Sequence, residues 1–240
     1  MEKFTPKAAA TPAPRARRGP VGSGRSAQGQ APALSRTAIL QTALELVADS
    51  GVAGLSTRKL AVRLQCQAMS IYHHFPSKQH LLDALVDHVI GTMQWPPADL
   101  DALQQLRAAM FAFRAMAHQH PAFFPYLALH RLNTPAGVRF IETILGLVQA
   151  VIPDARQAAR HFRAIGYYLV GAALDETAGY ARGPSAAQPV DDAFIATQCP
   201  RLAGASPYFQ RSEWDATFEL GVQALLHSVA QAAHGGGDGP

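Results

Sequence analysis

Eight residues between Thr57 and Lys78 have side chains that suit contact with a nucleic acid. Glutamine can form two hydrogen bonds to adenine, serine can donate or accept one, and methionine and alanine can contact the methyl group of thymine. Threonine, arginine and lysine at the start of a helix suit phosphate groups. The candidates for base contact are Gln67, Ala68, Met69, Ser70 and Tyr72, and the candidates for phosphate contact are Thr57, Arg58 and Lys78.

These residues fall on two short predicted helices joined by a turn. Ser56 is the predicted N-cap of the first helix, whose apolar side chains share one face. Residues 65–67 lead to a second segment, 68–75, which Pro76 ends because the residue before a proline is pushed out of the helical region. The pattern predicts a helix-turn-helix, whose second helix enters the major groove. The alternative is an ordinary helical hairpin with a polar surface.

The whole chain is predicted to be all-α. Of its 240 residues, 48% are hydrophobic and 16% are charged, which allows a sizeable core and excludes wholesale disorder. Ser35 is predicted to cap a first helix that Gly51 closes, and Ser77 to cap a helix that ends at Pro96. Further helices are predicted at 99–120, 123–132, 135–151, 154–182 and 213–233, whereas 183–212 is predicted to be an irregular connection, a lid or a flexible arm.

The chain divides into three predicted parts, at 1–33, 34–95 and 96–240. Residues 1–33 contain eight alanines, five prolines and four glycines, and six basic residues against one acidic residue. Such a segment cannot bury enough apolar surface to offset its ordering entropy, so we expect a disordered basic tail. Its arginines either contact DNA phosphates or are simply solvated.

Several classes of protein are not indicated by the sequence. The two cysteines form neither a disulfide framework nor a zinc cluster, and no apolar run is long enough for a membrane span or a signal peptide. The common nucleophile, phosphate-loop, dinucleotide and zinc-protease motifs are absent. We therefore expect a cytoplasmic protein that is not an enzyme, with no cofactor, no metal site and no membrane partner.

Residues 36–92 resemble the DNA-binding domain of the tetracycline-repressor (TetR) family. The resemblance rests on the stretches Leu55–Ala61, Ser70–Phe75, Ser77–Lys78 and Leu81–Leu85. Residues 96–240 are similar to the family's C-terminal domain in plan, most closely at Phe113–Arg114 and Gly171–Glu176. The resemblance implies an N-terminal three-helix domain with a helix-turn-helix, followed by a helical domain for ligand binding and dimerisation.

The resemblance also implies a function, that of a homodimeric repressor. Such a protein binds a palindromic double-stranded DNA operator, and a small-molecule inducer releases it. The resemblance places Tyr72 and Lys78 on phosphates and brings His74 into the DNA-contacting set. It implies dimerisation through the helices at 154–182 and 213–233, although their apolar stripes also suit an ordinary intramolecular core. The alternatives are a TetR-like activator and a regulator without a small-molecule ligand.

A ligand site is expected among the aromatic residues of the C-terminal part. Ligand pockets are mostly apolar, with a few polar groups that orient the ligand. The candidates for ligand contact are Phe113, His130, Phe140, Tyr167 and Tyr168. This set favours an apolar or aromatic inducer, unless the protein's own side chains fill the space. By family analogy, ligand binding moves the segment 121–132 and acts on the DNA-binding domain through the helix at 77–93.

Two residues depart from the family pattern in the predicted turn. The family usually has glycine where this chain has Gln65. If the backbone there is left-handed, glutamine costs ~1 kcal/mol relative to glycine. The family usually has an apolar residue where this chain has Cys66, which is either a small buried side chain or a redox-sensitive thiol.

Overall fold

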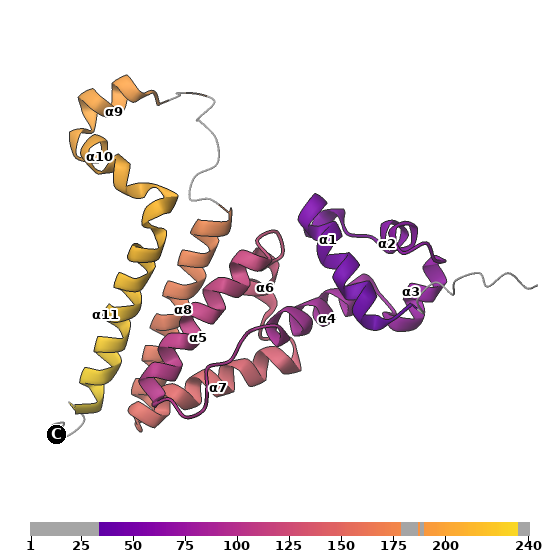
Figure 1. Cartoon of the computed structure of the whole chain (residues 1–240), viewed down its shortest axis with the longest axis horizontal. Helices are drawn as coiled ribbons and strands as arrows, with labels where there is room; N and C mark the ends of the chain where they lie inside the picture. Colours follow the sequence, from indigo (N-terminus) through magenta and orange to yellow (C-terminus); the bar gives the residue numbers. More distant parts are fainter. Residues whose placement is uncertain (1–33, 179–186, 188–189, 235–240) are drawn as a thin grey trace, which may run out of the picture. The chain divides into compact units, whose positions relative to one another are not determined.

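The computed structural model describes residues 34–178, 187 and 190–234, and this part of the chain is helical, with no β-strand. Figure 1 shows the helices in chain order. The bounds of the eleven α-helices in the described ranges are α1 Arg36–Gly54, α2 Thr57–Arg63, α3 Ala68–His74, α4 Lys78–Gly91, α5 Ala102–Gln119, α6 Phe124–His130, α7 Pro135–Val151, α8 Ala155–Ala178, α9 Asp192–Gln198, α10 Pro200–Ala205 and α11 Trp214–His234. The predicted all-α class is confirmed, and the predicted basic tail at 1–33 lies outside the described residues.

Serine side chains begin three of the first four helices, as the sequence predicts. The hydroxyl groups of Ser35, Ser56 and Ser77 accept hydrogen bonds from the backbone N–H of the third residue of α1, α2 and α4. Each hydroxyl thereby satisfies one of the donors that a helix start leaves unpaired. The buried faces of these helices form one apolar core, which includes Ile39, Leu60, Ile71, Phe75 and Leu85.

Two helix ends differ from the prediction. Gly51, at φ +67°, interrupts the helical backbone as expected of a C-cap glycine, but a further turn carries α1 on to Gly54. α4 ends at Gly91, five residues before Pro96. The hydroxyl of Thr92 donates to the carbonyl oxygen of Val89 at 2.7 Å and so satisfies a terminal carbonyl group. Proline is therefore not what stops this helix.

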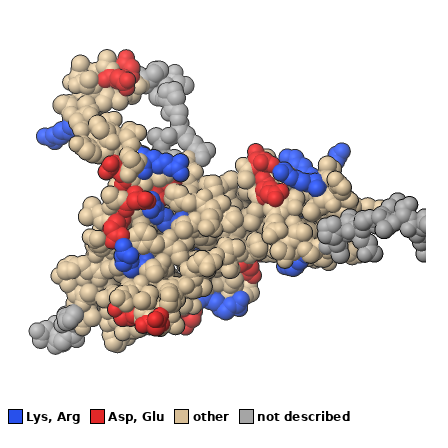
Figure 2. Space-filling model, viewed as in Figure 1, with Lys and Arg blue, Asp and Glu red and all other residues tan. Residues whose placement is uncertain are grey.

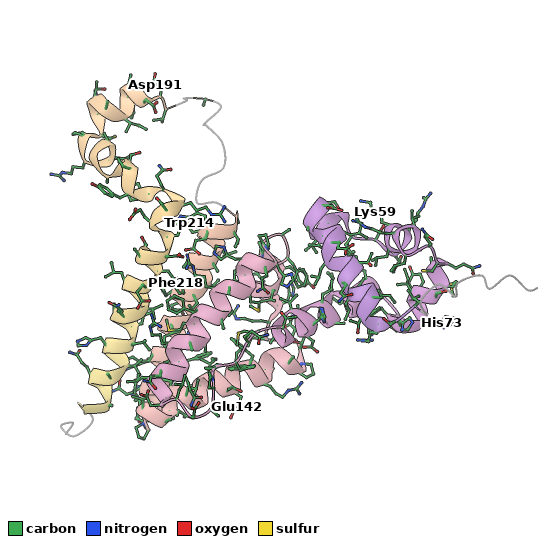
Figure 3. All side chains as sticks on the ribbon, viewed as in Figure 1. Lys59, His73, Glu142, Asp191, Trp214 and Phe218 are labelled. Atoms are coloured by element: carbon green, nitrogen blue, oxygen red, sulfur yellow. The ribbon has the colours of Figure 1, made fainter. Side chains whose placement is uncertain are left out.

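The helices α5, α7, α8 and α11 pack together around a second group of buried side chains. Asp101 and Gln104 form a reciprocal capping box at the start of α5. Phe218 of α11 is fully buried and lies between α5 and α8, with its ring 5.1 Å from that of Phe111 and 5.5 Å from that of Tyr168 (Figure 3). Such ring pairs add to the stability that burial alone supplies.

The connection between α8 and α11 is more ordered than predicted where the structure describes it. Residues 192–213 form α9, α10 and two turns of 3₁₀ helix, Ser206–Phe209 and Arg211–Glu213. The sequence carries local signals for this structure that its proline content obscured. The carboxylate of Asp191 caps α9 by accepting from Phe194 N at 2.7 Å, and Pro200 begins α10, where a missing N–H costs nothing. Figure 3 labels Asp191 at the start of this segment.

None of the described helices is both long enough and apolar enough to cross a bilayer.

Candidate functional site

The turn between α2 and α3 holds the two helices of the predicted helix-turn-helix in place. Gln65 has φ +52°, the one left-handed non-glycine residue in the described ranges. Its N–H donates to the carbonyl of Val62 at 3.2 Å, and the N–H of Cys66 donates to the carbonyl of Ala61 at 3.0 Å. This pair of hydrogen bonds is a Schellman motif, in which the left-handed position is normally glycine. The departure at Gln65 therefore adds strain without changing the turn.

One face of α3 is buried and the other is open to solvent. Ile71 and Phe75 are buried in the apolar core, whereas Met69 is 63% exposed and Tyr72 is 41% exposed. An exposed apolar methionine is suited to contact with a thymine methyl group. The N-terminal end of α3 is thus free to enter a groove.

The remaining residues predicted for DNA contact occupy the same two helices and the start of α4. Gln67 and Arg58 are exposed, while Ala68, Ser70 and His74 are partly buried. The hydroxyl groups of Thr57 and Tyr72 form a hydrogen bond at 3.2 Å, which brings two candidates for phosphate contact together from α2 and α3. The ammonium group of Lys78 donates one hydrogen bond to the carbonyl of Val52 at 3.1 Å, near the end of α1. Figure 3 labels Lys59 on α2 and His73 on α3, on either side of the turn.

Arg36 supports α3, and sequence reasoning did not single it out. Its Nη1 donates to the backbone carbonyl of His74 at 3.1 Å, and its guanidinium group lies 4.3 Å from the centre of the Phe75 ring. A cation near the C-terminal end of a helix interacts favourably with the helix dipole. Because the partners are 38 residues apart, only the tertiary structure identifies this contact.

A cavity of about 310 Å³ lies among α5, α7 and α8. Of the residues predicted for ligand contact, Phe113, Phe140 and Tyr167 line it. The rings of Phe113 and Phe140 stack with their centres 6.0 Å apart. Most of the other lining residues are aliphatic, among them Leu106, Met110, Ile144, Ile165, Leu169 and Val170. The cavity has the volume and the apolar lining of a small-molecule site.

The structure places the other two residues predicted for ligand contact outside this lining. The imidazole of His130 stacks on the ring of Tyr126 at 4.0 Å and is within hydrogen-bond distance of the Asn133 amide at 3.2 Å. The hydroxyl of Tyr168 donates to the carbonyl of Phe218 at 2.8 Å. Burial, and next the nearby charge of Glu176, raises the pKa of this hydroxyl.

Two hydrogen bonds join α4 to the helices around the cavity. The Oδ1 atom of Asp87 accepts from the backbone N–H of Ala136 at 3.1 Å, at the start of α7. The Nε2 atom of Gln79 donates to the hydroxyl of Tyr126 on α6 at 3.1 Å. Since α4 also packs against α1, and its buried side chains belong to the same apolar core as Ile71 of α3, these contacts connect the helix-turn-helix segment to the helices at the cavity.

A buried ion pair joins α5 to α8. Arg114 donates to both carboxylate oxygens of Glu176, at 2.7 and 3.0 Å, and His118 lies 2.6 Å from the same carboxylate. The side chains of Arg114 and Glu176 are only 11% and 7% exposed. Burial opposes the charge on Arg114, but its hydrogen bonds to Glu176 and Asp215 outweigh burial and raise its pKa. Figure 2 shows acidic and basic side chains side by side where α5, α8 and α11 meet.

The comparisons with known proteins identify the family. Residues 39–85 match the family described as bacterial regulatory proteins of the tetR family, and residues 97–232 match its tetracyclin repressor-like C-terminal domain. The chain belongs to the tetR family of bacterial regulatory proteins.

Individual relatives agree with this assignment. The chain is 32% identical over 208 residues to the class A tetracycline repressor protein of transposon 1721 from Escherichia coli, covering 82% of this chain and 91% of that protein. It is 32% identical over 203 residues to the class C tetracycline repressor protein of Escherichia coli, and the match covers 80% of this chain and 89% of that protein.

Solved structures of TetR proteins have a similar fold. A possible TetR family transcriptional regulator from Streptomyces coelicolor A3(2) is 27% identical with a TM-score of 0.64, covering 82% of this chain and 99% of that one. A TetR variant from Acinetobacter baumannii AYE in complex with minocycline shares the fold at 24% identity and a TM-score of 0.61. The match covers 83% of this chain and 98% of that one. This protein is accordingly a DNA-binding transcriptional regulator with a ligand-binding C-terminal domain.

Proposed function

We propose that the protein is a homodimeric repressor that binds a palindromic operator and is released by a small apolar or aromatic molecule. The observation that carries this proposal is the pairing of an exposed α3 face with an apolar cavity among α5, α7 and α8, whose helices are joined to α4. The tetracycline repressor proteins among its relatives support the repressor assignment by their names. A repressor acts on chromosomal or plasmid DNA, so we place it in the cytoplasm and assign it binding rather than catalysis.

The proposed DNA interface lies within 34–95 and the proposed ligand and dimer domain within 96–240. Gln67, Ala68, Met69 and Ser70 would contact base edges, and Thr57, Arg58, Tyr72, His74 and Lys78 would contact or approach phosphates. Gln67 to Ser70 lie at the start of α3, and Thr57, Arg58 and Lys78 lie at the N-termini of α2 and α4. Tyr72 and His74 lie further along α3 and are assigned by the family resemblance. Base contacts provide sequence specificity, whereas phosphate contacts provide affinity that depends on salt.

We assign dimerisation to α8 and α11. These two long helices pack against each other, and Leu220 on α11 is 70% exposed. A large exposed apolar side chain on one of two packed helices favours a further protein surface against it. In a two-fold dimer, α8 and α11 would form a four-helix interface with their copies.

Release requires the ligand to bind better to the conformation that does not bind the operator. We propose that a ligand in the cavity shifts the start of α7 and the adjoining α6. The Asp87–Ala136 and Gln79–Tyr126 hydrogen bonds would transmit this shift to α4. Movement of α4 would change the separation of the two α3 helices in the dimer and so reduce operator affinity.

The operator itself provides the first test. Purified full-length protein is incubated with fragmented genomic DNA from its source, and the retained fragments are sequenced. We expect one enriched palindrome, whose half-site spacing is near one helical turn, or about 34–36 Å between centres. Salt-sensitive retention with no enriched sequence would contradict base-specific recognition.

Variants then assign the roles. Met69→Ala should relax the preference at one base pair of each half-site, a change of about 1–3 kcal/mol in discrimination. Lys78→Ala should weaken binding to all sequences alike and reduce the slope of log K against log salt by about 0.9 for each phosphate lost. Arg139→Ala, an exposed charge change on α7, is the control that should leave both properties unchanged.

A further inference from the structure

The cavity among α5, α7 and α8 has two arginines in an otherwise apolar lining. Arg131, which follows α6, and Arg163, on α8, both contribute to its wall, and no aspartate or glutamate does. An apolar wall accounts for binding of a hydrophobic body. It does not account for two cations in the same wall, and the charge on Arg131 is costly because its guanidinium is partly withdrawn from water.

Arg131 is the more buried of the two cations. Its guanidinium group is half-buried, and this burial lowers its pKa. One Nη1–H group donates to the backbone carbonyl of Ala128. An arginine has five N–H donors in a planar fork, so this bond leaves donors that can pair with a carboxylate.

Arg163 faces the cavity together with Tyr167. Its Nε and Nη2 atoms both donate to the tyrosine hydroxyl, at 3.0 and 2.5 Å, and its guanidinium lies 5.2 Å from the centre of the same ring. These contacts hold the cation at the cavity wall, but they do not neutralise it.

Neither arginine pairs with a carboxylate within the described part of the chain. Other arginines there do: Arg63 pairs with Asp49, Arg107 with Glu219, and Arg114 with Glu176. Of the described arginines without a carboxylate partner, Arg131 and Arg163 are the two that line the cavity, so an anion bound there would meet two cations that the protein itself does not neutralise.

We propose that the molecule bound in this cavity is a small aromatic or aliphatic carboxylic acid, whose carboxylate pairs with Arg131 while Arg163 adds a second positive charge. The inference rests on the proposed function, in that the cavity is taken as the inducer site, and it specifies the chemical class of that inducer. The volume of about 310 Å³ is at the lower end of the range of about 300–1,000 Å³ for ligand pockets, so one or two fused rings suit it. The rings of Phe113 and Phe140 would pack against the apolar body.

The test uses probes that differ in charge and share a shape. Naphthalene-2-carboxylate, naphthalene-2-carboxamide and 2-naphthylmethylamine are titrated into the full-length protein at pH 7, with binding followed by calorimetry and by thermal unfolding. Benzoate, which is smaller, and decanoate, which is a longer aliphatic acid, extend the series in size. We expect a carboxylate to bind at least tenfold more tightly than its amide, and the amine to bind more weakly still.

Substitutions connect this preference to the two arginines. Arg131→Gln should remove most of the preference for the carboxylate over the amide, and Arg131→Lys should restore only part of it, because lysine lacks the planar fork. Arg163→Gln, at an exposed position, provides a second variant should Arg131→Gln fail to fold, and it should reduce the preference by a smaller factor. Arg139→Gln is the control, since it removes an exposed charge from α7 away from the cavity lining.

The outcomes separate the ligand class from the proposed function. Equal binding of acid and amide, tighter binding of the amine, or no binding of any acid at millimolar concentration would overturn the inference about ligand charge. Operator release is measured separately, by fluorescence anisotropy of the selected operator. A carboxylate that binds with the expected preference but leaves operator affinity unchanged supports the site and contradicts the inducer role.

Discussion

The carboxylate of Asp87 accepts a hydrogen bond from the backbone N–H of Ala136 at 3.1 Å, and this bond joins α4 to the first turn of α7. Thr134 caps the same turn from within, through its hydroxyl and the N–H of Gly137 at 3.2 Å. The start of α7 is thus capped twice, once by the neighbouring Thr134 and once by Asp87 of α4, the helix that follows the helix-turn-helix. A negative charge at a helix N-terminus is favourable, so the contact is stabilising as well as connecting.

We expect Asp87→Ala to uncouple ligand binding from operator release. The cavity lining stays intact, so the Kd for naphthalene-2-carboxylate should change little, while the effect of that ligand on operator affinity falls from a typical allosteric factor of about 5–150 toward one. Loss of the cap should also lower the free energy of unfolding by about 1 kcal/mol.

Asp87→Asn is the matched control for this prediction. The amide keeps an oxygen that can accept from Ala136 and loses only the charge, so most of the coupling should remain. The measurement is operator anisotropy with and without ligand. A normal ligand response in Asp87→Ala would show that the signal takes another route.

Replacing Gln65 by glycine should stabilise the protein. The residue occupies a left-handed position at φ +52°, where a side chain costs about 1 kcal/mol relative to glycine. Urea unfolding should therefore show a rise of about that size for Gln65→Gly. Gln65→Ala keeps the Cβ atom and should show no such rise, so equal stability of the two variants would argue against backbone strain as the cause.

Removing Glu176 should destabilise the protein far more than removing an exposed carboxylate. Glu176→Ala leaves the buried guanidinium of Arg114 without its main partner, and loss of one member of a buried pair costs about 3–5 kcal/mol. Glu219→Ala breaks a more exposed pair with Arg107 and should cost about 1 kcal/mol or less. Both are measured by chemical unfolding at one protein concentration, because dimerisation contributes to stability.

The double variant with Arg114→Met tests the reason for that difference. If the cost arises from an unpaired buried charge, replacing the arginine as well should recover part of the stability lost in Glu176→Ala. A double variant that is no more stable than Glu176→Ala would assign the cost to lost packing instead.

Stability should fall in mildly acidic solution because of His120. Burial, and secondarily the like charge of His88, lowers the pKa of this imidazole below its ordinary 6.5. As pH falls from 6.5 through the lowered folded pKa, the unfolded chain binds a proton that the folded protein resists, so the free energy of unfolding decreases. Above 6.5 both states are neutral at this group, and it contributes no slope.

Two substitutions isolate this effect in unfolding measurements across that pH range. His120→Gln should remove this contribution to the slope, and His88→Gln should only reduce it, because burial is the larger cause. A slope that is the same in wild type and His120→Gln would assign the pH dependence to other groups.

Gly137 should tolerate no side chain. A Cβ atom there would overlap the backbone carbonyl of Arg131, so Gly137→Ala forces the segment after α6 away from α7. We expect a loss of about 1–3 kcal/mol in stability, typical of overpacking, together with weaker binding of carboxylates because Arg131 is displaced.

Gly146→Ala is the comparison on the same helix. No atom lies within 4 Å of a Cβ atom at that position, and alanine is favoured over glycine in a helix interior by about 0.5–1 kcal/mol. Opposite signs for the two variants in thermal unfolding are the expected result. A gain in stability for both would mean that Arg131 can move without cost.

Local signals in the sequence were sufficient for most of the helices. Ser35, Ser56 and Ser77 begin helices because each side-chain hydroxyl accepts a hydrogen bond from a backbone N–H in the next turn. Such a bond needs no partner that is distant in the sequence. The same reasoning explains the left-handed turn at Gln65, which a helix-turn-helix requires whatever residue occupies it. Local signals were less successful in two places. Pro96 predicted a later end for α4, and the prolines of residues 183–212 predicted an irregular connection where the structure has α9 and α10.

The candidate sites depended more on tertiary structure. Spacing on α2 and α3 was enough to group the residues proposed to contact DNA, because a short turn fixes two adjacent helices. Among the aromatic residues considered for the cavity, composition could not separate Phe113 and Phe140, which line it, from Tyr168, which packs on Phe218. Helical periodicity indicates an inward face, but it does not say whether that face meets a cavity or a neighbouring side chain.

The sequence by itself determined the helical class, the DNA-reading segment and the family, since these depend on interactions within a few residues or on a recognisable motif. Tertiary structure alone decided which distant groups meet. Arg36 and the His74 carbonyl are 38 residues apart, Asp87 and the Ala136 N–H are 49 apart, and Arg114 and Glu176 are 62 apart. Burial makes the loss of one partner of Arg114 and Glu176 costly and leaves Arg131 partly buried without an anion, and burial is a property of the packed helices rather than of any local pattern.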